Sequence, residues 1–281
     1  SAITDIYQNS ILKDSSRNSF MIKRMEDLAD RTIWAMGEQL KCGNFVPFVF
    51  EHKFNMEVGD GDRKQLMSGT IDRVDICEND TDVYVRIIDY KTGKKDFNIV
   101  KTYYGIDIQL MVYMEAAMKL VAKMRPGKNV LPAGVFYYNI SDPIVSATNE
   151  SAEEIEDKIK GELRLKGMVN SDKDIAEKMD NTEGTSLNIP VSRKADGGFD
   201  SRRSKVMNTE QFNMLGRFVD VRAVDTADRI AGGDIRRSPY KDGQFSSCDR
   251  CPYGAVCGFS VDLPGCNYRK LKKFDDEVLW D

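Results

Sequence analysis

Apolar and polar positions along the chain follow two different periods, which predict helices and strands in separate segments. Helical spacing runs through residues 17–41, 106–124 and 209–231, and each of these stretches predicts an amphipathic helix. Apolar runs bounded by polar turns, one of which is residues 59–64, predict strands elsewhere. The predicted strands are residues 46–57, 66–77, 83–91 and 133–140.

The order of these segments limits the fold. Three strands in direct succession favour an antiparallel meander, and a helix between the third and fourth strands implies a crossover. The sequence therefore predicts an α/β (α+β) fold with a mixed central sheet flanked by helices. Beyond residue 145 the chain is more polar, with helices expected at 150–166 and 172–180 and a loop or hairpin at 184–205.

We expect four segments along the chain, which differ in pattern and composition. The first is an N-terminal helical segment and the second is the core that contains the sheet. A helical extension with basic loops follows, and a segment with clustered cysteines and a tail ends the chain. Their bounds are 1–45, 46–140, 141–245 and 246–281.

The composition is that of an ordinary soluble globular protein, with 41% hydrophobic and 31% charged residues among 281. No apolar run approaches the roughly 20 residues of a membrane span. No signal-peptide pattern opens the chain, so we expect a cytoplasmic protein without membrane contact. The net charge of −4 leaves room for nucleic-acid binding through a local basic patch or bound cations. The abrupt start at Ser-Ala suggests a piece of a larger protein.

Charged residues end the third predicted strand. Asp89 and Lys91 project from one face and Tyr90 from the other, because strand side chains alternate. If the second and third strands form a hairpin, Asp72 lies near Asp89, and Glu51 on the first strand can point the same way. Buried charge is costly unless it is paired or bound to a metal. For Asp89 and Lys91 taken alone, a salt bridge at the strand end is the simpler explanation.

A group of carboxylates beside one lysine has a specific chemical use. Mg²⁺ and Mn²⁺ prefer carboxylate and carbonyl oxygens as ligands. Such a metal lowers the pKa of a bound water molecule and neutralises phosphate charge, while a lysine orients the attacking water. This combination favours the hydrolysis of phosphodiester bonds.

Three short motifs, in this order and spacing, resemble the RecB-type branch of the PD-(D/E)xK nuclease superfamily. They are G-x-I-D-R-V-D at 69–75, I-D-Y-K-T-G at 88–93 and Q-L-M-V-Y at 109–113. The resemblance implies a restriction-endonuclease-like fold and a Mg²⁺-dependent deoxyribonuclease, which we expect to be an exonuclease. It also implies DNA as the substrate, and we expect this DNA to be single-stranded.

The resemblance assigns roles to individual residues. Asp72 and Asp89 match the aspartates that bind the metal, and the main-chain carbonyl of Tyr90 matches the group that completes that site. Lys91 matches the catalytic lysine. Two helix residues one turn apart match groups that support the site or touch the DNA backbone: Gln109 and Tyr113.

Glu51 and His52 match the family less closely. Members often carry an acid on the preceding strand, which makes Glu51 a further candidate metal ligand, although a stray glutamate at a strand edge fits equally well. Many members also have a metal-binding histidine on an upstream helix. His52 is the one histidine of this chain, and we expect it to be structural or exposed.

Four of the six cysteines lie close together near the end of the sequence, which suggests a metal or cluster site rather than isolated core thiols. Cys248, Cys251 and Cys257 follow a C-x2-C-x5-C spacing and supply three ligands. Cys266 as the fourth ligand gives a zinc site, and a distant cysteine gives a [4Fe–4S] cluster. Reduced cysteines without any metal are the remaining alternative.

The same cysteine spacing after a RecB-type core resembles the iron–sulfur nuclease domains of the AddB family. In that family the first cluster cysteine precedes the nuclease core, so its match falls before Ser1 and the cluster can be absent or incomplete in this piece. Of the other thiols, Cys42 is a weak candidate ligand and Cys77 is expected to be buried on a strand. The resemblance implies an AddA-type helicase–nuclease subunit as partner and DNA-end processing in double-strand-break repair.

Two alternatives remain open. A Cas4-like exonuclease joins a similar core to an iron–sulfur cluster, but the long insertion at 141–245 fits it poorly. A DNA-binding module without catalysis is disfavoured by the intact Asp72, Asp89 and Lys91.

Contact with DNA phosphates is expected from three basic stretches: Arg193 and Lys194 with Arg202, Arg203 and Lys205; Arg229 with Arg236, Arg237 and Lys241; and Arg269 and Lys270 with Lys272 and Lys273.

Overall fold

The computed structural model describes residues 15–59, 64–146, 148–272 and 280. Part of the predicted turn at 59–64 and one cation of the third basic stretch, Lys273, lie outside the described residues. The helices are α2 (Ser16–Lys41), α3 (Ile99–Tyr103), α4 (Gln109–Met124), α5 (Ala152–Glu162), α6 (Lys173–Met179), α7 (Thr209–Ala231) and α8 (Gly254–Cys257). The strands are β1 (Val46–Val58), β2 (Gln65–Glu78), β3 (Asp82–Lys91), β4 (Asn129–Asn139), β5 (Lys166–Asn170), β6 (Val206–Met207), β7 (Tyr240–Asp242), β8 (Phe245–Ser246) and β9 (Arg269–Lys270).

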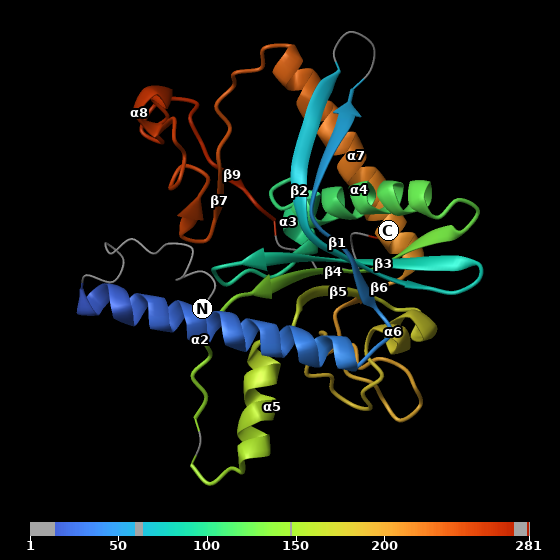
Figure 1. The fold of residues 1–281 in the computed structure, drawn as a ribbon. Coiled ribbons are helices and arrows are strands. Elements are labelled where there is room, and N and C mark those ends of the chain that lie inside the picture. Colours follow the sequence, from blue (N-terminus) through green and yellow to red (C-terminus); the bar gives the residue numbers. More distant parts are fainter. Residues whose placement is uncertain (1–14, 60–63, 147, 273–279, 281) are drawn as a thin grey trace. The chain divides into compact units, whose positions relative to one another are not determined.

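A mixed six-stranded sheet, with the strand order β1–β2–β3–β4–β5–β6, organises the fold (Figure 1). β2 and β3 pair antiparallel, which confirms the predicted hairpin, and β3 runs parallel to β4. Helices α3 and α4 lie between β3 and β4 in the sequence, so the predicted crossover is present. The α/β architecture with a mixed sheet flanked by helices is confirmed.

The sequence pattern misses the short strands β5 and β6. The helix expected at 150–166 ends earlier, at Glu162, and the residues from Lys166 onward pair antiparallel with β4 instead. Leu163 and Leu165 are buried between the two elements. Because these leucines supply apolar positions beyond the end of α5, periodicity alone does not locate the break.

Capping residues fix where several of the predicted helices start. Ser15 begins α2, because its side chain accepts a hydrogen bond from the Asn18 backbone N–H. Ser151 begins α5 in a capping box with Glu154, in which each side chain accepts from the other residue's backbone N–H. Asp172 begins α6 by accepting from two backbone N–H groups of the first turn.

The two faces of the sheet are covered by different helices. On one face, Tyr84, Ile88 and Tyr138 pack in an apolar cluster with Ala35 of α2 and Met179 of α6. The alternating residues of β3 point to the opposite face, over which the C-terminal half of α4 lies (Figure 1). The face that carries the acid of the third strand is therefore the one turned away from α2.

The chain divides into two compact units. Their described parts fall within residues 1–52, 71–97 and 117–209 for the first, and 53–70, 98–116 and 210–281 for the second. The second unit also contains a small sheet with the strand order β8–β7–β9. The four segments expected from the sequence stay a prediction.

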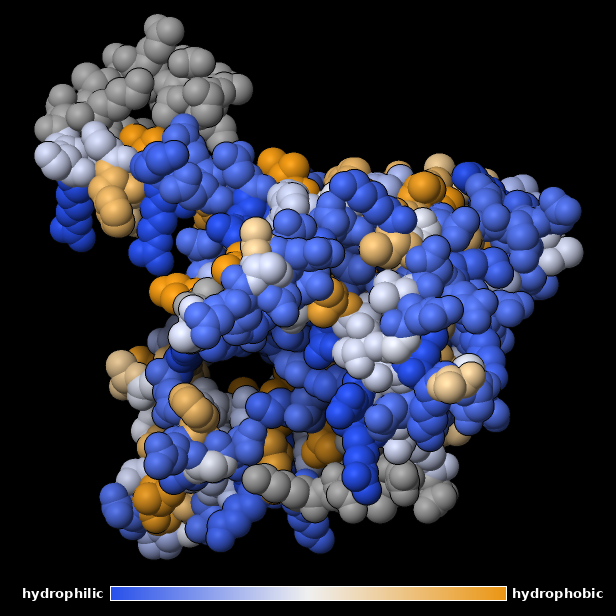
Figure 2. Space-filling model, turned by 90° about the horizontal axis from the view of Figure 1, so that it is seen from below, coloured by the Kyte–Doolittle hydropathy of each residue, from blue (hydrophilic) through white to orange (hydrophobic). Residues whose placement is uncertain are grey.

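Among the residues that the structure describes, no helix is both long and apolar enough to cross a bilayer. The face seen in Figure 2 is mostly hydrophilic, and apolar residues are scattered over it. Isolated surface residues of this kind are normal for globular proteins.

Candidate active site

The pairing of β2 with β3 brings two of the predicted acids to neighbouring positions. Arg73 is the register partner of Ile88 in this antiparallel pair. Asp72 precedes Arg73 and Asp89 follows Ile88, so the two acids lie side by side at the next position of the hairpin. The Oδ2 atom of Asp72 accepts a hydrogen bond from the Tyr90 backbone N–H at 2.7 Å. This hydrogen bond holds the Asp72 carboxylate next to the part of β3 that carries Asp89.

Asp89 is a nearly fully buried acid, with 2% of its surface exposed. Burial raises the pKa of its carboxyl, the Lys91 ammonium opposes this rise, and the Asp72 carboxylate adds to it. Lys91 Nζ lies 2.5 Å from Asp89 Oδ2 and 5.6 Å from the centre of the Tyr137 ring. The salt bridge that the sequence left as an alternative is therefore present, but its acid is buried and has a second acid beside it.

This acid pair fits the ligand requirements of Mg²⁺. The ion commonly binds through one or two carboxylates and keeps water or substrate phosphate oxygens as its other ligands. Asp72 and Asp89 supply that number of carboxylates. Within residues 15–272, apart from the undescribed gaps, no group of three or more His, Cys, Asp or Glu side chains is placed to hold a metal. Glu51, which is exposed on β1 with a φ of 48°, is thus not assembled with the pair.

Gln109 and Tyr113 lie together in the second compact unit. Gln109 Nε2 donates a hydrogen bond to Tyr113 Oη at 3.0 Å. The Tyr113 ring meets the Phe54 ring edge-on, with ring centroids 5.7 Å apart. Gly69 of the first motif leaves room for this contact, because a Cβ there would lie 2.8 Å from Phe54 Cε1. Residues from two of the motifs therefore form one packed group that orients Tyr113.

A buried triad of charged side chains lies next to Asp72, and the sequence analysis does not identify it. Asp75 accepts from Arg73 Nε at 2.6 Å and Arg73 Nη2 at 2.7 Å, and from Arg86 Nε at 2.9 Å. All three residues are 1% exposed or less. Asp75 is the register partner of Arg86. The signal in the sequence that could have revealed the triad is therefore a pair of opposite charges at paired positions of two apolar strands. The triad holds the strand segment that carries Asp72.

The cysteine segment is held by contacts within its own unit. Cys251 N donates to the Cys248 carbonyl at 3.2 Å, and α8 carries Cys257, whose carbonyl accepts from Arg237 Nη1. As placed in the described residues, these thiols do not form a metal-holding group, so their cluster role stays a prediction. Cys77 is buried on β2, as predicted.

Several cations of the predicted basic stretches bond within their own unit. Arg193 donates to three backbone carbonyl oxygens. Arg236 and Arg229 both hydrogen-bond to Asp234 and hold the pKa of its carboxyl far below the ordinary range. These arginines organise loops, which leaves less of their charge for DNA phosphates.

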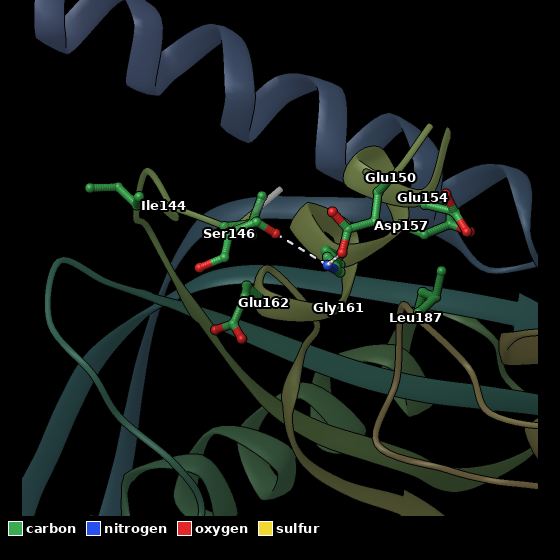
Figure 3. Close-up of a pocket in the computed structure, with 10 residues that line it drawn as sticks. Ile144, Ser146, Glu150, Glu154, Asp157, Gly161, Glu162 and Leu187 are labelled. Atoms are coloured by element: carbon green, nitrogen blue, oxygen red, sulfur yellow. Dashed lines mark hydrogen bonds and ion pairs between the residues drawn. The ribbon is translucent and has the colours of Figure 1, made fainter. Parts of the chain in front are cut away.

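Two pockets of opposite charge lie in the first unit. One has a volume of about 850 Å³, and its single lysine, Lys158, is bound to the Glu150 carboxylate and the Ser146 carbonyl (Figure 3). The remaining acids of this pocket repel a polyanion: Glu154, Asp157 and Glu162. The other pocket, of about 510 Å³, directly follows Lys91 in the chain and carries three lysines that the sequence analysis does not single out: Lys94, Lys95 and Lys166.

The chain is similar to known proteins over nearly its whole length. The sequence profile described as "PD-(D/E)XK nuclease superfamily" matches residues 2–258. The chain is 37% identical to a subunit of the ATP-dependent helicase/deoxyribonuclease of Clostridium botulinum (strain Hall), with 96% of this chain and 24% of that protein covered. The corresponding subunits from Clostridium acetobutylicum and Caldanaerobacter subterraneus are 37% and 36% identical, with the same coverage. The chain therefore spans about a quarter of the length of these curated relatives.

Proposed function

The chain belongs to the PD-(D/E)XK nuclease superfamily, and on that premise we propose that it is a metal-dependent DNA nuclease domain that hydrolyses phosphodiester bonds. The observation that carries this proposal is the buried Asp89 carboxylate, which is paired with Lys91 and has Asp72 beside it. A structural ion pair needs only one acid. The second acid raises the electrostatic cost of the first, and a bound cation removes that cost.

Asp72 and Asp89 would hold Mg²⁺ or Mn²⁺, with the Tyr90 carbonyl as a further predicted ligand. Bound there, the metal would activate a water molecule and neutralise charge on the phosphate. The donor set of hard oxygen atoms suits these ions.

Lys91 is the residue that we propose acts on the substrate. Its side chain is 30% exposed, whereas that of Asp89 is 3% exposed, so the ammonium stands at the entrance of the site. From there it orients the attacking water and stabilises negative charge that develops on the phosphate. Gln109 and Tyr113 support the site or contact the DNA backbone.

The names of the relatives support a larger setting for this domain. They describe an ATP-dependent helicase/deoxyribonuclease subunit of which this chain matches 24%. We infer that the domain works as an exonuclease on single-stranded DNA in a cytoplasmic helicase–nuclease, with an AddA-type subunit as partner, and processes the ends of double-strand breaks. In the full-length protein, Cys248, Cys251 and Cys257 would supply three ligands of a [4Fe–4S] cluster.

The test is Mg²⁺-dependent cleavage of a single-stranded oligonucleotide by the purified chain. We expect Asp89→Ala and Lys91→Ala to lower the cleavage rate by about 10² to 10⁴, the range typical of lost catalytic groups. Lys178→Gln is the matched control, because Lys178 is a half-buried lysine over the Tyr84 ring, on the other face of the sheet. Full cleavage by either alanine variant rejects the proposal. Cation titration that detects no Mg²⁺ or Mn²⁺ binding favours a DNA-binding module instead.

A further inference from the structure

The basic pocket introduced above begins where the predicted catalytic strand ends. It has a volume of about 510 Å³ and is lined by residues 92–96, residues 139–141, Glu162 and Lys166. Residues 92–96 follow Lys91 directly, and Asn139 is the register partner of Lys91 on β4. We call this hollow the strand-end pocket.

Strand pairing places Lys166 in line with the acid pair. Lys166 on β5 is the register partner of Tyr137 on β4, and Tyr137 is the register partner of Asp89 on β3. Register partners project from the same face of a sheet, and neighbouring strands lie about 4.8 Å apart. The Lys166 backbone is therefore about 10 Å from that of Asp89, and their side chains share a face.

The backbone that carries Lys166 is held close to its neighbour. A Cβ added to Gly167 would collide with the Val135 carbonyl oxygen, and it would lie 2.9 Å from Phe136 Cα. Glycine is thus required for β5 to approach β4 this closely. Lys166 stands on a rigid strand rather than on a loop, which suits a group that must meet a ligand in one position.

The cations of the strand-end pocket are incompletely neutralised. Among the described residues, neither Lys94 nor Lys166 forms an ion pair or a side-chain hydrogen bond. Asp96, one of the two acids in the pocket, is paired with Lys205 at 2.5 Å, which leaves Glu162 as the other acid. Net positive charge remains beside the acid pair.

The surroundings of Lys166 disfavour its own charge. Burial lowers the pKa of its ammonium, and the Arg164 guanidinium lowers it further, while Glu162 and Asp96 oppose these effects. An anion in the pocket would offset both the burial and the repulsion. A half-buried lysine without a carboxylate partner is therefore better explained by a role in binding an anion than by a role in protein stability.

We propose that the strand-end pocket binds a backbone phosphate of the DNA strand next to the phosphate that is cleaved, with Lys166 and Lys94 as its cationic ligands. This inference rests on the proposed nuclease function, because the acid pair defines the position of the cleaved phosphate. Phosphate contacts of this kind set the register of a strand without reading its bases. The pocket would thus hold the strand in place on one side of the metal site.

The test is equilibrium binding of a fluorescently labelled oligothymidylate in EDTA at several salt concentrations. We expect Lys166→Gln to raise Kd about ten-fold, as for a lost charge-assisted hydrogen bond, and to reduce the slope of log K against log salt by about 0.7, as for one lost contact on a single strand. Lys94→Gln should act in the same direction, and Lys178→Gln should leave both quantities unchanged. In cleavage assays the pocket variants should raise KM with little change in kcat. Binding by Lys166→Gln that equals that of the Lys178→Gln control overturns the inference.

A second arm identifies which phosphate occupies the pocket. In a series of oligothymidylates, one uncharged methylphosphonate linkage is moved stepwise along the strand. At one position the linkage should weaken oligonucleotide binding by the unaltered chain but not by the Lys166→Gln variant. If no position behaves this way and inorganic phosphate binds the unaltered chain more tightly than Lys166→Gln, the pocket takes a free phosphate and the strand-binding inference is wrong. Circular dichroism confirms folding, and the neutral glutamine is not expected to lower the Tm.

These outcomes separate the two proposals. If the unaltered chain cleaves DNA and Lys166→Gln does not change DNA binding, the proposal for the strand-end pocket is wrong and the proposed nuclease function stands. Lysine-dependent DNA binding without any Mg²⁺-dependent cleavage refutes the nuclease, and with it the placement beside a cleaved phosphate, while the pocket keeps its phosphate contact.

Discussion

The buried triad of Arg73, Asp75 and Arg86 provides the most direct test of how the β2–β3 hairpin is held together. We consider Asp75→Asn, which keeps the size and shape of the side chain and removes its charge. Asp75 accepts hydrogen bonds of 2.6, 2.7 and 2.9 Å from the two arginines. The substitution leaves two guanidinium groups buried side by side without the carboxylate that they share, and the new amide presents donors to groups that are themselves donors only.

The magnitude follows from burial. All three residues are 1% exposed or less, so water does not compensate the arginines, and burial already lowers the pKa of the Arg86 guanidinium against the opposing effect of Asp75. Removing one partner from a buried pair costs about 3–5 kcal/mol of unfolding free energy. For a chain of this size, that corresponds to a fall in Tm on the order of 6–15 °C.

The assay is urea unfolding followed by the fluorescence of Trp34, which packs against the core of the same unit. Asp80→Asn is the matched control, because Asp80 is exposed in the turn between β2 and β3, and such surface changes stay within about 0.5 kcal/mol. An Asp75→Asn variant as stable as the Asp80→Asn control would refute the reasoning. Replacing all three triad residues with apolar side chains of similar volume should restore much of the loss, since an intact buried ion pair is often no more stable than an apolar replacement.

Three further predictions concern Mg²⁺ binding, the stability of the metal-free protein and the cysteines. Burial raises the pKa of Asp89, so Mg²⁺ must displace a proton there at acid pH. Calorimetry should therefore show that Mg²⁺ affinity rises with pH, with a midpoint above the ordinary aspartate pKa of about 3.9. A midpoint at or below that value contradicts the burial argument. By the same linkage, the metal-free protein loses stability as pH rises from the ordinary value through the raised pKa, so Asp89→Asn should raise the neutral-pH Tm while it abolishes cleavage. Anaerobically purified full-length protein should contain iron and show a broad visible absorption band. Zinc without iron would instead favour a site completed by Cys266. If the protein contains neither iron nor zinc, the cysteines bind no metal.

The sequence alone predicts those parts of the site that depend on neighbouring strands. Asp72 and Asp89 lie on consecutive strands that are joined by a short turn, so strand alternation and hairpin pairing are enough to bring them together. Lys166 is different. Its place beside Tyr137 depends on a five-residue strand that follows a helix without a clear break and on the close approach allowed by Gly167. Such non-local pairing has no signature in the local pattern.

The β2–β3 hairpin carries buried charge on both faces, and the buried carboxylates have different partners on the two faces. On the α2 side, the Asp75 carboxylate accepts hydrogen bonds from two arginines. On the opposite side, Asp89 is paired with Lys91, and the neighbouring Asp72 carboxylate adds to the rise of the Asp89 pKa that burial causes. Evolution of stability alone would favour the first arrangement on both faces, because an excess acid raises the cost of burial. Two neighbouring carboxylates, one of them buried, are therefore the structural reason to expect a cation at this edge of the sheet. The lysines of the strand-end pocket are the reason to expect the phosphate chain beside it.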